Sequence, residues 1–236
     1  MTQITTFGTL QSRIAARLID PSSVAISLPN VQQAINDAIF YWKNFKFFFN
    51  QSLAVLTMDT TAAVNGTATS DPYILGYGNT NSNYPHAPVL PSDFLYEEPN
   101  NGFVIPYNHL RYRILKKSPA QYDATNVGGV GLPFIYTYRN GNYEFYFLPN
   151  IAYTMNVYYR KDYLPLVDTG DNNDFTNYAD KLIEYDAISR LLSDLRLDDD
   201  RADRFAARAA QENRTLQSRS AKQDATGELV VETIIS

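Results

Sequence analysis

A long amphipathic segment, residues 177–197, limits the folds open to this chain more than any other stretch. Its large apolar residues recur every three or four positions, which places them on one side of an α-helix. Asn177 is positioned to cap the first turn, and no proline or glycine interrupts the segment. We therefore predict a single central core helix, against which the other elements pack. The apolar positions are Tyr178, Leu182, Tyr185, Ile188, Leu192 and Leu195.

A second apolar stripe predicts a helix over residues 7–19, with Thr6 as its cap and a proline after its end. Arg13 and Arg17 lie four residues apart on the other side of this helix. Two interpretations of this pair are open. The arginines either form a solvated face or contact another subunit.

A third stripe predicts a helix over residues 28–49, with Ser27 as a plausible cap. Its last part, FYWKNFKFFF, is apolar on most sides, so it must be covered on most sides. We expect this part to enter the core or a neighbouring subunit. For Phe47 and Phe48, an interface is as good an interpretation as the core.

Between these helices the apolar period changes to the alternation typical of strands. Aromatic strands flank Asn140-Gly141, the favoured pair for a type I′ hairpin, and a further strand at 153–159 would complete a three-stranded antiparallel meander. Ser118 and Gln121 fit a capping box that opens a short helix. Residues 59–87 are rich in Thr, Asn, Ser, Gly and Tyr, which favours either a contact loop or a plain surface excursion. Other strands are expected at 53–57, 103–106 and 109–116.

The C-terminal region combines a weakly amphipathic helix with an apolar tail. The helix, about residues 201–222, has only Phe205 and Leu216 as large apolar residues, so we expect it to project from the body or be completed by a partner. The tail ends in GELVVETIIS, whose β-branched residues would either fray or add as a strand to the sheet edge of another chain.

These elements predict an α+β fold: a helical bundle formed by N- and C-terminal helices, with an inserted antiparallel β-rich region. We expect a helical core from residues 1–50 and 166–223, a β-rich insertion at 51–165 and a C-terminal arm at 224–236.

Composition excludes several function classes. The 236 residues include no cysteine, which removes disulfides, thiolate nucleophiles and cysteine-ligated zinc. A formal net charge of −5 argues against DNA binding as the main activity. We expect no membrane span and no secretion signal, and we expect synthesis in a reducing cytoplasm.

The chain also carries little catalytic chemistry. It has two histidines, His86 and His109, with no helical pairing and no nucleophile elbow. The acidic segment DTGDNND has the wrong order for a calcium loop. We therefore predict no catalytic, cofactor or metal site, and no enzyme activity.

Several segments, taken in order, resemble the head-to-tail adaptor proteins of tailed bacteriophages, also called connector or tail accessory proteins. They are RIAARLID, VQQAINDAIFYW, LPSDFL, GLPFIYTYRNGNYEFYFLP, TMNVYYRKDYLPL and NYADKLIEYDAISRLLSDL. The resemblance covers most of the chain but not residues 59–87. It implies a structural virion protein, made in the host cytoplasm, that forms a ring beneath the portal at the phage neck.

The resemblance implies further that the ring is typically a dodecamer, which extends the DNA channel and attaches a downstream tail or nozzle protein. DNA would pass through without specific binding. An acidic lumen and an arm suited to strand addition agree with this interpretation. The expected portal or subunit interface comprises Arg201, Arg204, Phe205, Arg208, Leu216, Leu229, Val230, Val231, Ile234, Ile235, Phe47 and Phe48.

Two other hypotheses remain at this stage. The first is a tail or fibre module that binds carbohydrate through its loop rich in Tyr and Asn. The second is a virion-associated cell-wall glycosidase, for which Glu97, Glu98 and Glu144 are the carboxylates to test.

Overall fold

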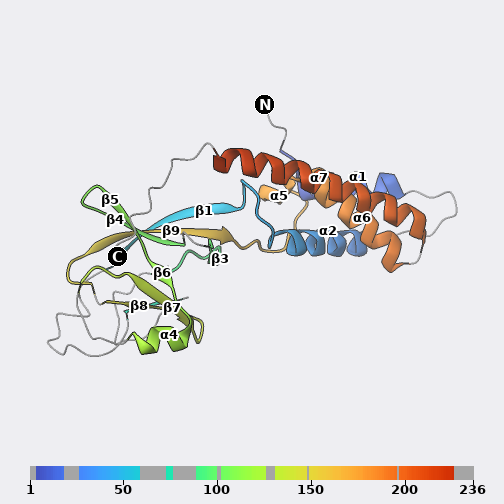
Figure 1. Ribbon diagram of the computed structural model, residues 1–236. Helices are drawn as coiled ribbons and strands as arrows, with labels where there is room; N and C mark the ends of the chain where they lie inside the picture. Colours follow the sequence, from blue (N-terminus) through green and yellow to red (C-terminus); the bar gives the residue numbers. More distant parts are fainter. Residues whose placement is uncertain are drawn as a thin grey trace. The chain divides into compact units, whose positions relative to one another are not determined.

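The computed structural model describes residues 4–18, 27–58, 73–76, 89–99, 102–125, 131–147, 149–195 and 197–225 (Figure 1). Helices and antiparallel sheet both contribute, so the fold is α+β, as the sequence predicts. The chain divides into two compact units. The helical unit comprises residues 1–50 and 163–236, and the β-rich unit comprises residues 51–162, whereas we had expected the second boundary at 165/166.

The helical unit is built around α6, which lies between α2 and α7 and also contacts α1 (Figure 1). Apolar side chains from all of these helices form one core, in which Leu182, Ile183 and Ile188 of α6 are fully buried. This explains why the amphipathic segment dominates the sequence. The helices are α1 (Phe7–Leu18), α2 (Leu28–Trp42), α5 (Asp174–Tyr178), α6 (Asp180–Asp194) and α7 (Asp199–Ala225).

The predicted single helix over residues 177–197 is wrong in one respect, because the structure has two helices with a break at Ala179. Asn173, and not Asn177, caps the first of them. Its side chain accepts the backbone N–H of Thr176 at 3.1 Å, and the Thr176 hydroxyl accepts the backbone N–H of Asn173 at 3.0 Å. This capping box fixes α5 as a separate turn. Tyr178 is consequently half exposed and does not belong to the core stripe.

The prediction that the second helix runs to Phe49 is also wrong, because α2 ends at Trp42. The buried carboxamide of Asn50 accepts the backbone N–H of Phe47 at 3.0 Å and donates to the carbonyl of Phe45 at 2.8 Å. These bonds satisfy the backbone of a loop that would otherwise be buried without partners. Phe47 and Phe49 stack at 5.2 Å between ring centroids and enter the core from this loop.

The β-rich unit contains two sheets that share one core, in which Phe103, Phe145 and Met155 are fully buried. The first sheet has the order β1-β9-β4-β5, with β3 also paired to β9, and the second has the order β2-β8-β7-β6. The strands are β1 (Gln51–Met58), β2 (Tyr73–Gly76), β3 (Phe94–Glu97), β4 (Phe103–Tyr107), β5 (Leu110–Arg113), β6 (Leu115–Lys116), β7 (Ile135–Arg139), β8 (Asn142–Tyr146) and β9 (Tyr153–Lys161).

The predicted three-stranded meander is wrong, because β9 leaves the β7-β8 hairpin and joins the other sheet. There it pairs with β1 over eight consecutive positions, from Gln51↔Arg160 to Met58↔Tyr153. Alternate residues of β9 then point into the core between the sheets, where Met155 and Val157 are fully buried. A further strand, β2, lies within the segment 59–87 that we had expected to be a loop.

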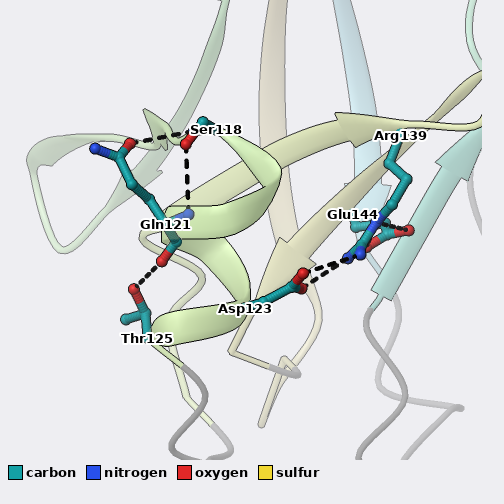
Figure 2. Close-up of polar contacts among 6 residues, drawn as sticks. All are labelled: Ser118, Gln121, Asp123, Thr125, Arg139 and Glu144. Atoms are coloured by element: carbon teal, nitrogen blue, oxygen red, sulfur yellow. Dashed lines mark hydrogen bonds and ion pairs between the residues drawn. The ribbon is translucent and has the colours of Figure 1, made fainter.

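Two local predictions in this unit are confirmed. Asn140 and Gly141 have φ values of 52° and 79°, as a type I′ hairpin between β7 and β8 requires. The predicted capping box opens α4 (Pro119–Ala124), where the Ser118 hydroxyl accepts the backbone N–H of Gln121 (Figure 2). Figure 2 also shows Arg139 donating to Glu144 and to Asp123, so this guanidinium links the hairpin to α4.

Candidate functional site

The candidate site lies on α7, which packs along α6 and does not project as we had expected. Asp198 begins this helix by accepting the backbone N–H of Arg201 at 2.9 Å. The buried side of α7 is made mostly of small residues, which allows α6 to approach closely and compensates for the scarcity of large apolar residues. The buried positions are Ala202, Phe205, Ala209, Leu216 and Ser220.

Three arginines form a basic flank beside this buried side: Arg201, Arg204 and Arg208. Their spacing of three and four residues places them in one row along the helix. Arg201 donates to the backbone carbonyl of Arg17 at 2.8 Å, and the Arg208 guanidinium lies 6.0 Å from the ring centroid of Tyr185. Within the described part of the chain, no carboxylate forms an ion pair with any of the three.

The neighbouring arginines of α1, Arg13 and Arg17, form ion pairs with carboxylates of α6. Glu184 of α6 has a side chain that is only 1% exposed, and it accepts from both Arg13 and Arg17, with Arg17 Nε at 2.5 Å. Arg13 also binds Asp180 at 2.7 Å. Burial alone would lower the pKa of Arg13, but its hydrogen bonds to the two carboxylates outweigh burial and raise the pKa. These two arginines are therefore neutralised within the unit, whereas no described carboxylate neutralises the three on α7.

The structure places the other expected interface residues in different environments. Phe47, Phe205 and Leu216 lie in the core of the helical unit, where they are 0%, 8% and 4% exposed. They stabilise the unit that carries the basic flank and have almost no surface of their own to offer. Phe48 is half-buried against the same core, and its backbone N–H donates to the Ser220 hydroxyl at 2.9 Å. The arm residues Leu229, Val230, Val231, Ile234 and Ile235 lie outside the described residues.

A comparison with family models gives a match to the SU10 adaptor protein family over residues 5–231. The chain belongs to this family of phage head-to-tail adaptors. A comparison with curated proteins gave no match. The family is a structural one, so the chain is a virion protein that takes part in tail assembly. The resemblance noted in the sequence is thus confirmed at the level of the family.

The carboxylates named for a glycosidase in this adaptor are all engaged in ion pairs. Glu97 is buried and accepts from Lys116, from Tyr143 at 2.5 Å and from Tyr136 at 3.4 Å. Glu98 binds Arg160, and Glu144 binds Arg139 at 2.6 Å. These interactions fit a structural role. Of the loop at 59–87, named for carbohydrate binding, all residues except 73–76 lie outside the described residues.

Two negative findings apply to the described parts of the adaptor. Among those residues, no cluster of His, Asp or Glu has the arrangement needed to hold a metal ion. None of the helices there combines the length and the apolarity needed to cross a membrane.

Sequence reasoning missed Asp180 and Glu184 as the partners of Arg13 and Arg17, for which it offered only a solvated face or a subunit contact. A signal for them exists. Arg13 and Arg17 are four residues apart on one helix, and Asp180 and Glu184 are four residues apart on another. When two helices pack side by side, a pair of arginines on one and a pair of carboxylates on the other can form ion pairs if both pairs have the same spacing.

Proposed function

We propose that this adaptor assembles as a closed ring, a dodecamer, beneath the portal, extends the DNA channel and attaches the downstream tail protein. The observation that carries the proposal is the basic flank of α7. It presents three guanidinium groups without a carboxylate partner in the described residues, on a chain whose net charge is −5. Such a flank is electrostatically complementary to an acidic partner from outside the chain.

The portal is the partner that we assign to this flank. Guanidinium groups held in a row recognise carboxylates better than lysines do, because each can form two parallel hydrogen bonds. Arg201 and Arg208 are already held, by the carbonyl of Arg17 and by the ring of Tyr185, so less conformational entropy is lost on docking. DNA passes through the ring without specific binding, since the overall negative charge opposes a stable grip on phosphates.

The test compares two charge reversals on the same helix. Arg204 is exposed on the basic flank, and among the described residues it has no ion pair that would be lost when it is changed. Arg214 is also exposed but lies ten residues further on, which at about 100° per residue puts it roughly 80° away around the helix. Arg204→Glu should weaken binding to the purified portal ring by about tenfold or more at low salt, and Arg214→Glu should change it much less.

The dependence of portal binding on salt concentration provides a second test. Binding of the unmodified adaptor should weaken as salt rises from about 0.05 to 0.5 M, since exposed charge pairs are screened. The affinity of the Arg204→Glu variant for the portal ring should depend less steeply on salt. Equal affinities for all three proteins at every salt concentration would contradict the assignment of this flank to the portal.

A further inference from the structure

The feature that carries a further inference is the edge of β1 that faces away from β9. This strand pairs with β9 on one side along its whole length, and no described strand pairs with its other side. Its eight residues, QSLAVLTM, include no charge and no proline, and the register with β9 contains no bulge. Leu53 and Val55 are 51% and 62% exposed. A long, regular, apolar edge of this kind readily pairs with another strand.

The other sheet edges in the described residues are protected. β5 carries Arg111 and Arg113 within four residues, β3 has an irregular register, and β2 and β6 have only four and two residues. Short, charged or irregular edges discourage strand addition. The contrast singles out β1 as the acceptor.

The chain itself contains a segment that fits this edge. Residues 229–235, LVVETII, are one residue shorter than β1. Alternation would place Leu229, Val231, Thr233 and Ile235 on one face and Val230, Glu232 and Ile234 on the other. Both faces are therefore mainly apolar, with Glu232 as the one charge. β1 also has two apolar sides to extend: the exposed pair on the outer side, and Ala54 and Leu56, which pack half-buried against the core on the inner side.

We propose that the edge of β1 accepts residues 229–235 from a second copy of the adaptor as an added strand. α7 ends at Ala225, with three residues between it and this segment, and the partner that we assign to the segment is a neighbouring copy in the ring. The added strand links each copy to the next through its backbone. This inference rests on the proposed assembly of several copies, and it assigns one contact between neighbouring copies.

The absence of cysteine from the chain makes a crosslinking test clean, since each introduced thiol is unique. Leu53→Cys marks the acceptor edge and Val231→Cys marks the arm. Leu110→Cys is the matched control, because Leu110 is an equally exposed leucine, at 52%, on the protected edge β5. The full-length variants are mixed in pairs, assembled on the portal ring and treated with a short bismaleimide.

The expected result is a crosslinked dimer from Leu53→Cys mixed with Val231→Cys, and at least about tenfold less from Leu110→Cys mixed with Val231→Cys, as side-chain proximity requires. A Leu53→Cys/Val231→Cys double variant that crosslinks only within one chain would overturn the proposal. So would complexes that sediment as complete rings but give no crosslink. A failure to form rings at all would instead contradict the proposed function.

Hydrogen exchange provides a measurement that does not depend on the position of a thiol. Backbone amides of β1 should exchange more slowly in the assembled adaptor than in an assembly of a variant truncated after Ala225. The backbone amides of β5 should exchange at the same rate in both assemblies. Equal exchange at β1 in the two assemblies would overturn the proposal.

Discussion

The two units of the adaptor each contain a buried glutamate, and the two are neutralised in different ways. In the helical unit, Glu184 is paired with Arg13 and Arg17, whose charge does not depend on pH in the range where proteins fold. In the β-rich unit, Glu97 accepts from Lys116 and from the hydroxyls of Tyr136 and Tyr143. The network around Glu184 is built of fixed charges. The network around Glu97 depends in part on two tyrosine hydroxyls, which can lose their protons at alkaline pH.

This difference follows from what each architecture can supply. Two helices that pack side by side present residues four positions apart on each, so two arginines can meet two carboxylates. Stacked sheets bring together aromatic side chains that alternate along the strands, so a buried carboxylate there meets tyrosine hydroxyls. We therefore expect the helical unit to be sensitive to loss of charge and the β-rich unit to be sensitive to alkaline pH.

The largest effect should come from Arg13→Met/Arg17→Met. Both arginines are partly exposed, but Glu184 is not, so their removal leaves a buried carboxylate without a counter-ion. We expect a loss of about 3–5 kcal/mol in the free energy of unfolding. Trp42, the chain's one tryptophan, lies in the helical unit, so its fluorescence during urea unfolding measures this unit. Arg204→Met is the control and should change stability by less than about 0.5 kcal/mol.

A smaller effect, of about 2–3 kcal/mol, should follow Glu97→Ala. This change leaves the hydroxyls of Tyr136 and Tyr143 without their acceptor, but Lys116 has a side chain that is 57% exposed and can be solvated. Hydrogen exchange in β7 and β8 should become faster, whereas the Trp42 transition should keep its midpoint. A shift of the Trp42 midpoint with no change in β7 would show that the two units do not respond separately.

Alkaline pH should distinguish the units without any mutation. Burial, followed by the interactions with Glu97, raises the pKa of Tyr136 and of Tyr143 above the ordinary value of 10.0. Because folding raises these pKa values, the stabilisation is complete below pH 10 and is lost as the pH rises above it. The free energy of unfolding of the β-rich unit should therefore fall more steeply above pH 10 than the free energy measured from the Trp42 transition. The Tyr143→Phe variant should lose stability less steeply above pH 10. An equal dependence of the unfolding free energy on pH in this variant and in the unmodified chain would contradict this assignment.

The smallest effect should come from Asp171 in the helical unit. Its carboxylate accepts the backbone N–H groups of Val167 and Asp168, both at 2.8 Å, and these bonds lower its pKa below 3.8. The contribution is present above about pH 4 and is lost as the pH falls, because folding lowers this pKa. Asp171→Asn should slightly reduce stability at pH 7, and this difference should shrink as the pH falls below about 4. An NMR titration of the carboxyl group would measure the shift directly.

The sequence was sufficient wherever a few adjacent residues determine the structure. The hairpin at Asn140-Gly141 and the capping box at Ser118 depend on residues within four positions of each other, and both were predicted correctly. The first helix, with its apolar stripe, was predicted to within one residue at its end. The family could also be recognised, because it depends on the order of several segments along the chain.

The sequence was insufficient where distant residues decide the outcome. The end of α2 is set by the side chain of Asn50, which replaces helical hydrogen bonds that the aromatic residues would otherwise continue. The pairing of β9 with β1 joins strands about a hundred residues apart, and alternation alone does not select a partner. The burial of Glu184 depends on arginines from α1, so a residue that looks exposed on its own helix is covered by another.

The measurement that tests this account most directly is sedimentation velocity of the purified chain, alone and mixed with the portal ring. We expect a single large complex with a fixed number of adaptor copies per portal ring, one that dissociates when Arg204 is replaced by Glu. A chain that remains a monomer and does not change the sedimentation of the portal would contradict the ring, the basic flank as a docking surface and the proposed function together.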